Sequence, residues 1–218
     1  VNRAAKGRNI TMKRAIGAPL RVMSSRAFVA LVLAISVGVP FSLPGTVQAQ
    51  SRDGLALWGQ IHSVFSHPRC SNCHVGEDGV PLWSGAHYDA EETPRAHGMF
   101  IAGGSDRHGG DTTPCSTCHG DQNAAPLHGP PGAPHWGLPP VEMQWAGRSS
   151  REICEQIKNP ATNGNRSIED VADHVGRDAL VLWGWDPGEG REPAPYSSDQ
   201  LVAFILQWDA LGAPCPAE

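Results

Sequence analysis

Two pentapeptides constrain this 218-residue chain more than any other feature. They are Cys70-Ser71-Asn72-Cys73-His74 and Cys115-Ser116-Thr117-Cys118-His119. Each reads C-x-x-C-H, the pattern at which a c-type haem is attached through two thioether bonds, with the histidine as the proximal ligand of the iron. Because the histidine is in register in both copies, the sequence predicts two covalently attached haem c groups with His74 and His119 as proximal ligands.

The first 49 residues have the organisation of an export signal. They contain seven Lys and Arg but no Asp or Glu, and then an apolar run from Ala27 to Val39 and a small-x-small site at Val47-Gln48-Ala49. The run is about 13 residues long, whereas a membrane-spanning helix needs roughly 20. We expect residues 1–49 to be a signal peptide cleaved near Ala49/Gln50, and residues 50–218 to form a single dihaem cytochrome c domain in the periplasm. The alternative is an uncleaved membrane anchor.

Residues 50–218 carry a different charge from the whole chain. Seven of the 17 Lys and Arg lie in the first 49 residues, so only 10 face the 22 Asp and Glu, and the formal balance is −12. This excess of negative charge argues against nucleic acid as a partner. Redox proteins with a basic docking surface are the expected partners, because complementary charge accelerates encounter.

The remaining two of the six cysteines are Cys154 and Cys215. An exported chain would normally oxidise such a pair, so we predict a disulfide that ties the C-terminal residues to an earlier helix. The alternative is two free buried thiols.

The periodicity of apolar residues predicts a mainly α fold with long irregular loops, and no strand pattern stands out. With the two C-x-x-C-H motifs, a fold like that of cytochrome c is expected. A first helix is expected from Asp53, as a possible N-cap, to Phe65, because Pro68 comes soon after. Three capping boxes predict three further helices; these boxes are Ser149–Glu152, Ser167–Asp170 and Ser197–Gln200. The last helix has the clearest apolar stripe and ends at Gly212, before Pro214.

The ligand on the second face of each iron decides between electron transfer and binding of small molecules. We rank His174 first, because it lies on the apolar side of its helix beside Val171 and Val175, where an unsatisfied imidazole would be costly. The alternative is a core histidine bonded to a backbone carbonyl or a haem propionate. His97 ranks second, because it lies between the two motifs; a surface loop histidine is the alternative.

Weaker distal candidates also lie near the motifs. His67 and His108 each come shortly before a motif and could reach a neighbouring haem, and Met99 and Met143 could supply a thioether ligand. His62 shares a helix face with Trp58 and is expected to be a packed or surface residue. The remaining histidines are expected in loops: His87, His128 and His135.

Several segments together match one pattern: His67–His74, Arg107–Gly109, Pro134–Trp136, Glu142–Trp145, Ile153–Gln156, His174, Leu180–Trp185 and Gly212–Pro216. With the two C-x-x-C-H motifs they resemble a family of exported dihaem cytochromes c often labelled as isoquinoline 1-oxidoreductase subunits. The resemblance covers nearly all of residues 50–218. It implies a protein that carries electrons from a periplasmic molybdenum-dependent hydroxylase towards the respiratory chain. The chain has no recognisable molybdopterin or flavin motif, so the dehydrogenase itself would be another polypeptide.

Three functions are compatible with these motifs. The first is a periplasmic electron carrier with two fully ligated haems, in which the protein tunes and orients the cofactors. The second is a dihaem enzyme, such as a peroxidase, with one open or displaceable coordination site. However, the usual dihaem peroxidase is a longer chain with two separate cytochrome domains. The third is a zinc module or disulfide oxidoreductase, but neither needs a histidine directly after both C-x-x-C pairs. We therefore expect an electron-transfer protein rather than an enzyme.

Overall fold

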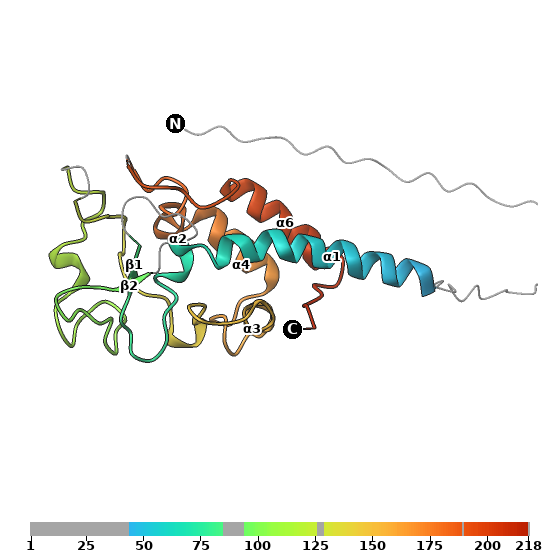
Figure 1. The fold of residues 1–218 in the computed structure, drawn as a ribbon, viewed down its shortest axis with the longest axis horizontal. Coiled ribbons are helices and arrows are strands. Elements are labelled where there is room, and N and C mark those ends of the chain that lie inside the picture. The colour runs from blue at the N-terminus through green and yellow to red at the C-terminus, as the bar shows by residue number, and fades with distance from the viewer. Residues whose placement is uncertain (1–43, 85–93, 126–128, 189, 218) are drawn as a thin grey trace, which may run out of the picture. The chain divides into compact units, whose positions relative to one another are not determined.

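The computed structural model describes residues 44–84, 94–125, 129–188 and 190–217, which belong to one compact unit (Figure 1). The helices are α1 Pro44–Phe65, α2 Pro68–Ser71, α3 Ser150–Lys158, α4 Ile168–Arg177, α5 Ala179–Leu182 and α6 Ser198–Ala210. Two 3₁₀ helices are η1 Cys115–Thr117 and η2 Val141–Met143, and two short strands are β1 Leu82–Trp83 and β2 Arg95–Ala96. The predicted mainly α class with long loops is confirmed. None of the described helices is long and apolar enough to cross a bilayer.

Helix α1 begins earlier than predicted. It starts at Pro44 rather than at Asp53 and runs through the expected cleavage position without a break. Proline is favoured at the first helical position, because its fixed φ suits a helix and its missing N–H has no partner there. Asp53 is therefore an exposed residue within the helix and not its N-cap. The end at Phe65, before Pro68, is as predicted.

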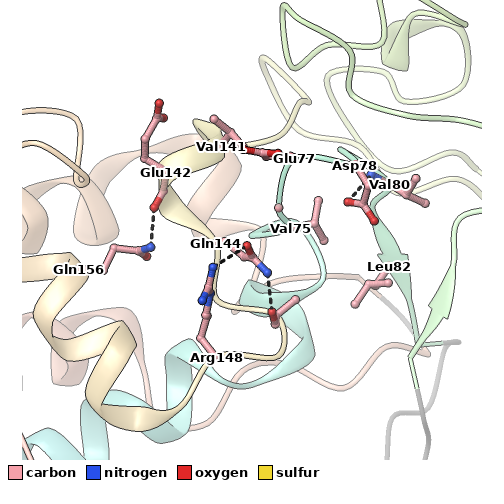
Figure 2. A pocket seen from close by; sticks show the side chains of 12 residues that line it. Val75, Glu77, Asp78, Val80, Leu82, Val141, Glu142, Gln144, Arg148 and Gln156 are labelled. Atoms are coloured by element: carbon pink, nitrogen blue, oxygen red, sulfur yellow. Dashed lines mark hydrogen bonds between the residues drawn. The ribbon is translucent and has the colours of Figure 1, made fainter.

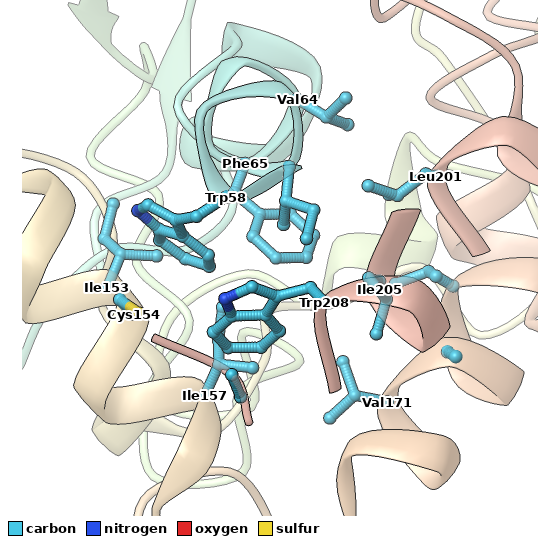
Figure 3. Packing of buried hydrophobic residues seen from close by; sticks show 14 of the residues in the cluster. Trp58, Val64, Phe65, Ile153, Cys154, Ile157, Val171, Leu201, Ile205 and Trp208 are labelled. Atoms are coloured by element: carbon cyan, nitrogen blue, oxygen red, sulfur yellow. The ribbon is translucent and has the colours of Figure 1, made fainter. Parts of the chain in front are cut away.

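The core lies where α1, α4 and α6 pack together, and α3 closes one side (Figure 3). The indoles of Trp58 and Trp208 meet in its middle, with ring centres 5.1 Å apart. Each indole N–H has a partner: Trp58 donates to Ser150 Oγ at 2.8 Å and Trp208 donates to the Pro214 carbonyl at 2.9 Å. Full burial of each large apolar side chain stabilises the fold by about 1.5–3 kcal/mol. Cys70 of the first motif packs against this core, so the helices fix its position.

All three predicted capping boxes are present. The hydroxyls of Ser149, Ser167 and Ser197 each accept the backbone N–H three residues on, and the side chain at that position accepts the N–H of the cap. The predicted disulfide is also present, because Cys154 and Cys215 are bonded with an S–S distance of 2.01 Å. Gly54 of α1 lets the tail approach, since a Cβ there would lie 2.5 Å from Pro214 Cγ.

The structure contains a strand pair for which the sequence shows no pattern. β1 and β2 form an antiparallel pair in which Leu82 faces Ala96 and Trp83 faces Arg95. The pair is too short to give an alternating apolar pattern, so periodicity could not reveal it. The pair matters for the site because His97 is the next residue after β2 and its position is fixed by that strand.

Candidate haem sites

The first C-x-x-C-H motif begins on the short helix α2. The N–H of His74 bonds to the Cys70 carbonyl at 3.3 Å, so one helical turn brings the two thiols and the imidazole together. Cys70 and Cys73 are half-buried free thiols. Burial raises the pKa of Cys70 to about 12 and that of Cys73 to about 11. A reactive redox cysteine instead needs a low pKa, so these thiols do not suit a disulfide oxidoreductase.

The ring of His74 is fixed from two directions. Its Nδ1–H donates to the Met143 carbonyl at 2.7 Å, and the ring stacks on the indole of Trp145 at 3.5 Å with an interplanar angle of 2°. Burial is the largest cause that lowers the pKa of His74, to about 3, so the imidazole is neutral at physiological pH. Because a carbonyl can only accept a hydrogen bond, the proton is on Nδ1 and the lone pair of Nε2 is available to a metal ion.

The second motif repeats this arrangement on the 3₁₀ helix η1. Nδ1–H of His119 donates to the Pro131 carbonyl at 2.7 Å, and the ring stacks on Trp136 at 4.7 Å with an interplanar angle of 3°. Burial again lowers the pKa of His119. The two tryptophans lie flat against the histidines of the two motifs. Two motifs in unlike surroundings thus present their imidazoles in the same way.

A cavity of about 220 Å³ opens beside the first motif. Cys70, Cys73 and His74 line it, and His174 on α4 lines it too. His174 is close enough to lower the pKa of His74. Much of the remaining lining is apolar: Phe65, Leu138, Val171, Val175, Leu180 and Val181.

His174 differs in one respect from the expectation. It was predicted on the apolar side of its helix, and its neighbours Val171 and Val175 are buried. However, 37% of its own side chain is exposed, because it stands at the wall of the cavity rather than in the core. Its Nδ1 lies 3.5 Å from Oδ2 of Asp178.

His97 lies at the second motif. Its ring centre is 6.1 Å from that of His119, with an interplanar angle of 60°. At this separation, both imidazoles could bind one metal ion. Nδ1 of His97 lies 2.9 Å from the Gly98 carbonyl, so its Nε2 is also available. The strand pair places this residue, because β2 immediately precedes it and its N–H bonds to the Pro81 carbonyl at 2.8 Å.

The weaker distal candidates are distributed between the two sites and the surface. His108 and the side chain of Met143 line the first cavity, as does His135. His67 caps α2 through Nδ1, which accepts the Arg69 N–H at 3.3 Å. Met99 is 72% exposed. His62 packs beside Trp58 at 6.1 Å between ring centres, as expected, and His87 and His128 lie outside the described residues.

Hydrogen bonds of two loop side chains, Arg107 and Asn123, join segments around the motifs, and the sequence did not predict them. Arg107 donates to the carbonyls of Val75 at 3.1 Å and Pro139 at 2.7 Å, which ties the chain after the first motif to the approach to the second. Asn123 accepts N–H groups from Gly132 and from the indole of Trp183, both at 3.0 Å. A single Arg or Asn in a loop carries no sequence signal for such a role.

The two motifs also lie near each other. Cys115 is close enough to Cys73 to contribute to its raised pKa, after the larger effect of burial. Trp136 meets Trp183 edge to face at 5.1 Å between ring centres, and both indoles line the first cavity. The aromatic ring stacked on His119 therefore also borders the site of His74.

A second hollow of about 700 Å³ lies on the side of Val75, the residue after the first motif (Figure 2). The carboxylates of Glu77, Asp78 and Glu142 line it, and Gln144 accepts a bond from Arg148 at 3.2 Å. Among the described residues, no group of three or more His, Cys, Asp or Glu is arranged to hold a metal ion by itself. The residues that line this hollow and those that line the first cavity are different.

The donor set of the first cavity suits a haem. Two imidazoles, two thiols and an apolar wall lie around one space, and Arg69 and Arg166 line it with positive charge that could face propionates. Trp145 is 7% exposed, and its indole N–H is buried without a hydrogen-bond partner. Such an N–H costs free energy unless something in the cavity accepts it. Comparisons with protein-family models, curated proteins and solved structures gave no match.

Proposed function

We propose that this chain is an exported electron-transfer protein that holds two c-type haems, each between two histidines. One observation carries the proposal: at both motifs, a proximal imidazole with Nδ1 held by a carbonyl lies near a second histidine with its own Nδ1 partner. When bound, haem iron supplies one-electron chemistry. The protein's part is to ligate, orient and bury it.

The assignment of ligands follows from this arrangement. His74 and His174 would hold the first haem, and His119 and His97 the second, with thioethers from Cys70 and Cys73 and from Cys115 and Cys118. Two filled axial positions favour electron transfer over binding of peroxide or other small molecules. The proximity of Cys73 to Cys115 supports transfer between the two haems.

The decisive test is the mass and the reduced spectrum of the protein expressed with export. We expect two haems in the wild type, and one in each of the variants Cys70→Ala/Cys73→Ala and Cys115→Ala/Cys118→Ala. A wild-type mass without haem would refute the proposal.

The axial ligands are tested by three matched substitutions. His174→Ala and His97→Ala should each turn one haem high-spin and open it to carbon monoxide, whereas His62→Ala, on α1, should leave both spectra unchanged. Rapid binding of carbon monoxide to the reduced wild type would instead favour the peroxidase-like alternative, in which one coordination site is open or displaceable.

The partner is proposed from charge and from the family resemblance. A formal balance of −12 over residues 50–218 suits a donor or acceptor with a basic surface. A periplasmic molybdenum hydroxylase-type dehydrogenase is the proposed donor, and a component of the respiratory chain is the proposed acceptor. Reduction of this protein by such a dehydrogenase should slow as ionic strength rises, because salt screens the attraction. A rate independent of salt would contradict this docking mode.

A further inference from the structure

The four imidazoles at the two sites do not have equivalent Nδ1 partners. Three of them face neutral backbone carbonyls: those of Met143, Pro131 and Gly98, at 2.7, 2.7 and 2.9 Å. His174 alone faces a carboxylate, with Asp178 Oδ2 at 3.5 Å. Among the described residues, a carboxylate therefore lies at Nδ1 of one of the four proposed ligands.

The carboxylate of Asp178 is held firmly. Its Oδ1 accepts the N–H groups of Leu180 at 2.9 Å and Val181 at 3.2 Å, which caps α5. Its own N–H bonds to the His174 carbonyl at 3.0 Å, so backbone and side chain are both fixed relative to that residue. Asp178 also lines the first cavity. One oxygen thus anchors the group, and the other lies 3.5 Å from Nδ1 of the imidazole.

We propose that Asp178 is a positioning residue for the first haem: it turns Nε2 of His174 to the iron and lowers the reduction potential of that haem. The inference rests on the proposed function. A carboxylate on the outer N–H of a ligating histidine fixes the tautomer and makes the imidazole a stronger donor. A nearby negative charge also stabilises the more positive, oxidised iron. At the second site, Nδ1 of each histidine faces a backbone carbonyl among the described residues, so this tuning by a carboxylate is proposed for the first haem.

The same helix supplies a matched control. Burial and then the charge of Arg166 lower the pKa of His174, and the charges of Asp178 and of Asp173, the residue before it, oppose this shift. However, Asp173 Oδ1 pairs with Arg177 Nε at 2.8 Å rather than with the imidazole. Asp173→Asn and Asp178→Asn therefore remove the same charge from the same neighbourhood, but only the second removes the contact.

The experiment is a redox titration of the two-haem protein that measures each haem separately. His174→Ala identifies the transition of the first haem by its change of spin state. Asparagine caps helices as well as aspartate, so Asp178→Asn should retain α5, and an unchanged unfolding midpoint would verify this. We expect it to favour reduction of the first haem about tenfold in the equilibrium constant, a rise of about 59 mV for one electron, with the second haem unchanged.

The other variants decide the interpretation. Asp173→Asn should give less than half of this shift, and Asp178→Glu, which keeps the charge, should stay close to the wild type. Equal shifts in the two Asn variants, or none in Asp178→Asn, would overturn the inference while two bound haems left the proposed function intact. A preparation without haem would overturn both.

Discussion

The two C-x-x-C-H sites are built alike and placed differently. At each, a helical turn carries the cysteines, a carbonyl holds Nδ1 of the histidine, and an indole lies flat on its ring. The first site adjoins the helical core, and its tryptophan, Trp145, is 7% exposed. The second lies on loops, where Cys118 is exposed and Trp136 is only half-buried. The contacts that hold the histidine ring are thus the same at both sites, whereas the burial of the surrounding residues differs.

The largest expected difference between the two sites is the loss of stability when the tryptophan of each is replaced. Trp145→Ala should lower the free energy of unfolding by about 3–5 kcal/mol, because it leaves a large void beside Phe65 in the core. Trp136→Ala removes the same side chain from a loop and should cost about 1 kcal/mol. Denaturant unfolding monitored by circular dichroism measures both. Equal losses would show that the second site is as much a part of the core as the first.

The disulfide should stabilise the helical region in particular. Cys154 and Cys215 are 61 residues apart in sequence, and a cross-link over such a loop contributes about 4 kcal/mol by restricting the unfolded chain. The double substitution Cys154→Ala/Cys215→Ala should therefore lower the unfolding midpoint, and the spectrum of the proposed second haem should persist in the folded protein. Mild reduction of the wild-type disulfide is the control and should give a similar loss. A stability unchanged by either treatment would contradict this account.

The smallest predicted effect concerns the helix that carries His174. Ser167→Ala removes the cap of α4 and should cost about 1 kcal/mol, whereas Ser167→Thr keeps the hydroxyl and should cost less. The proposed second haem would take no ligand from α4, so its spectrum should be the same in both variants. Thermal unfolding measures the difference, and equal midpoints for Ala and Thr would show that the hydroxyl does not matter.

The stability that this capping box contributes should also depend on pH. The backbone N–H of Ser167 and then its hydroxyl hold the pKa of Asp170 below its ordinary value of 3.8. The charged carboxylate is thus favoured in the folded state, so its contribution is present above pH 3.8 and is lost as the pH falls through the folded pKa. Asp170→Asn should flatten the acid limb of the stability curve, and a curve that coincides with the wild type would exclude a role for this group.

Part of the fold could be predicted because its signals are local. A capping box spans four residues, and a helical stripe repeats every three or four, so α3, α4 and α6 were recognised with their caps. The start of α1 at Pro44 was missed because the sequence before Asp53 has no apolar stripe that indicates a helix. The strand pair was missed because it has only two residues on each side. Both errors concern places where the local signal is weak or absent.

The site divides in the same way. The thiols and adjacent histidines of the two motifs were predictable from the sequence, because that signature depends on residue type and short spacing. The disulfide was predictable because Cys154 and Cys215 are the two cysteines outside the motifs. The sequence could rank His174 and His97 but not assign them to a motif. Only the tertiary structure decided that His174 lies by His74, that His97 lies by His119, and that Asp178 lies behind one of the four rings. The physical reason is that these contacts join segments far apart in the chain, such as His74 and Met143, 69 residues apart, which meet only when the helices pack.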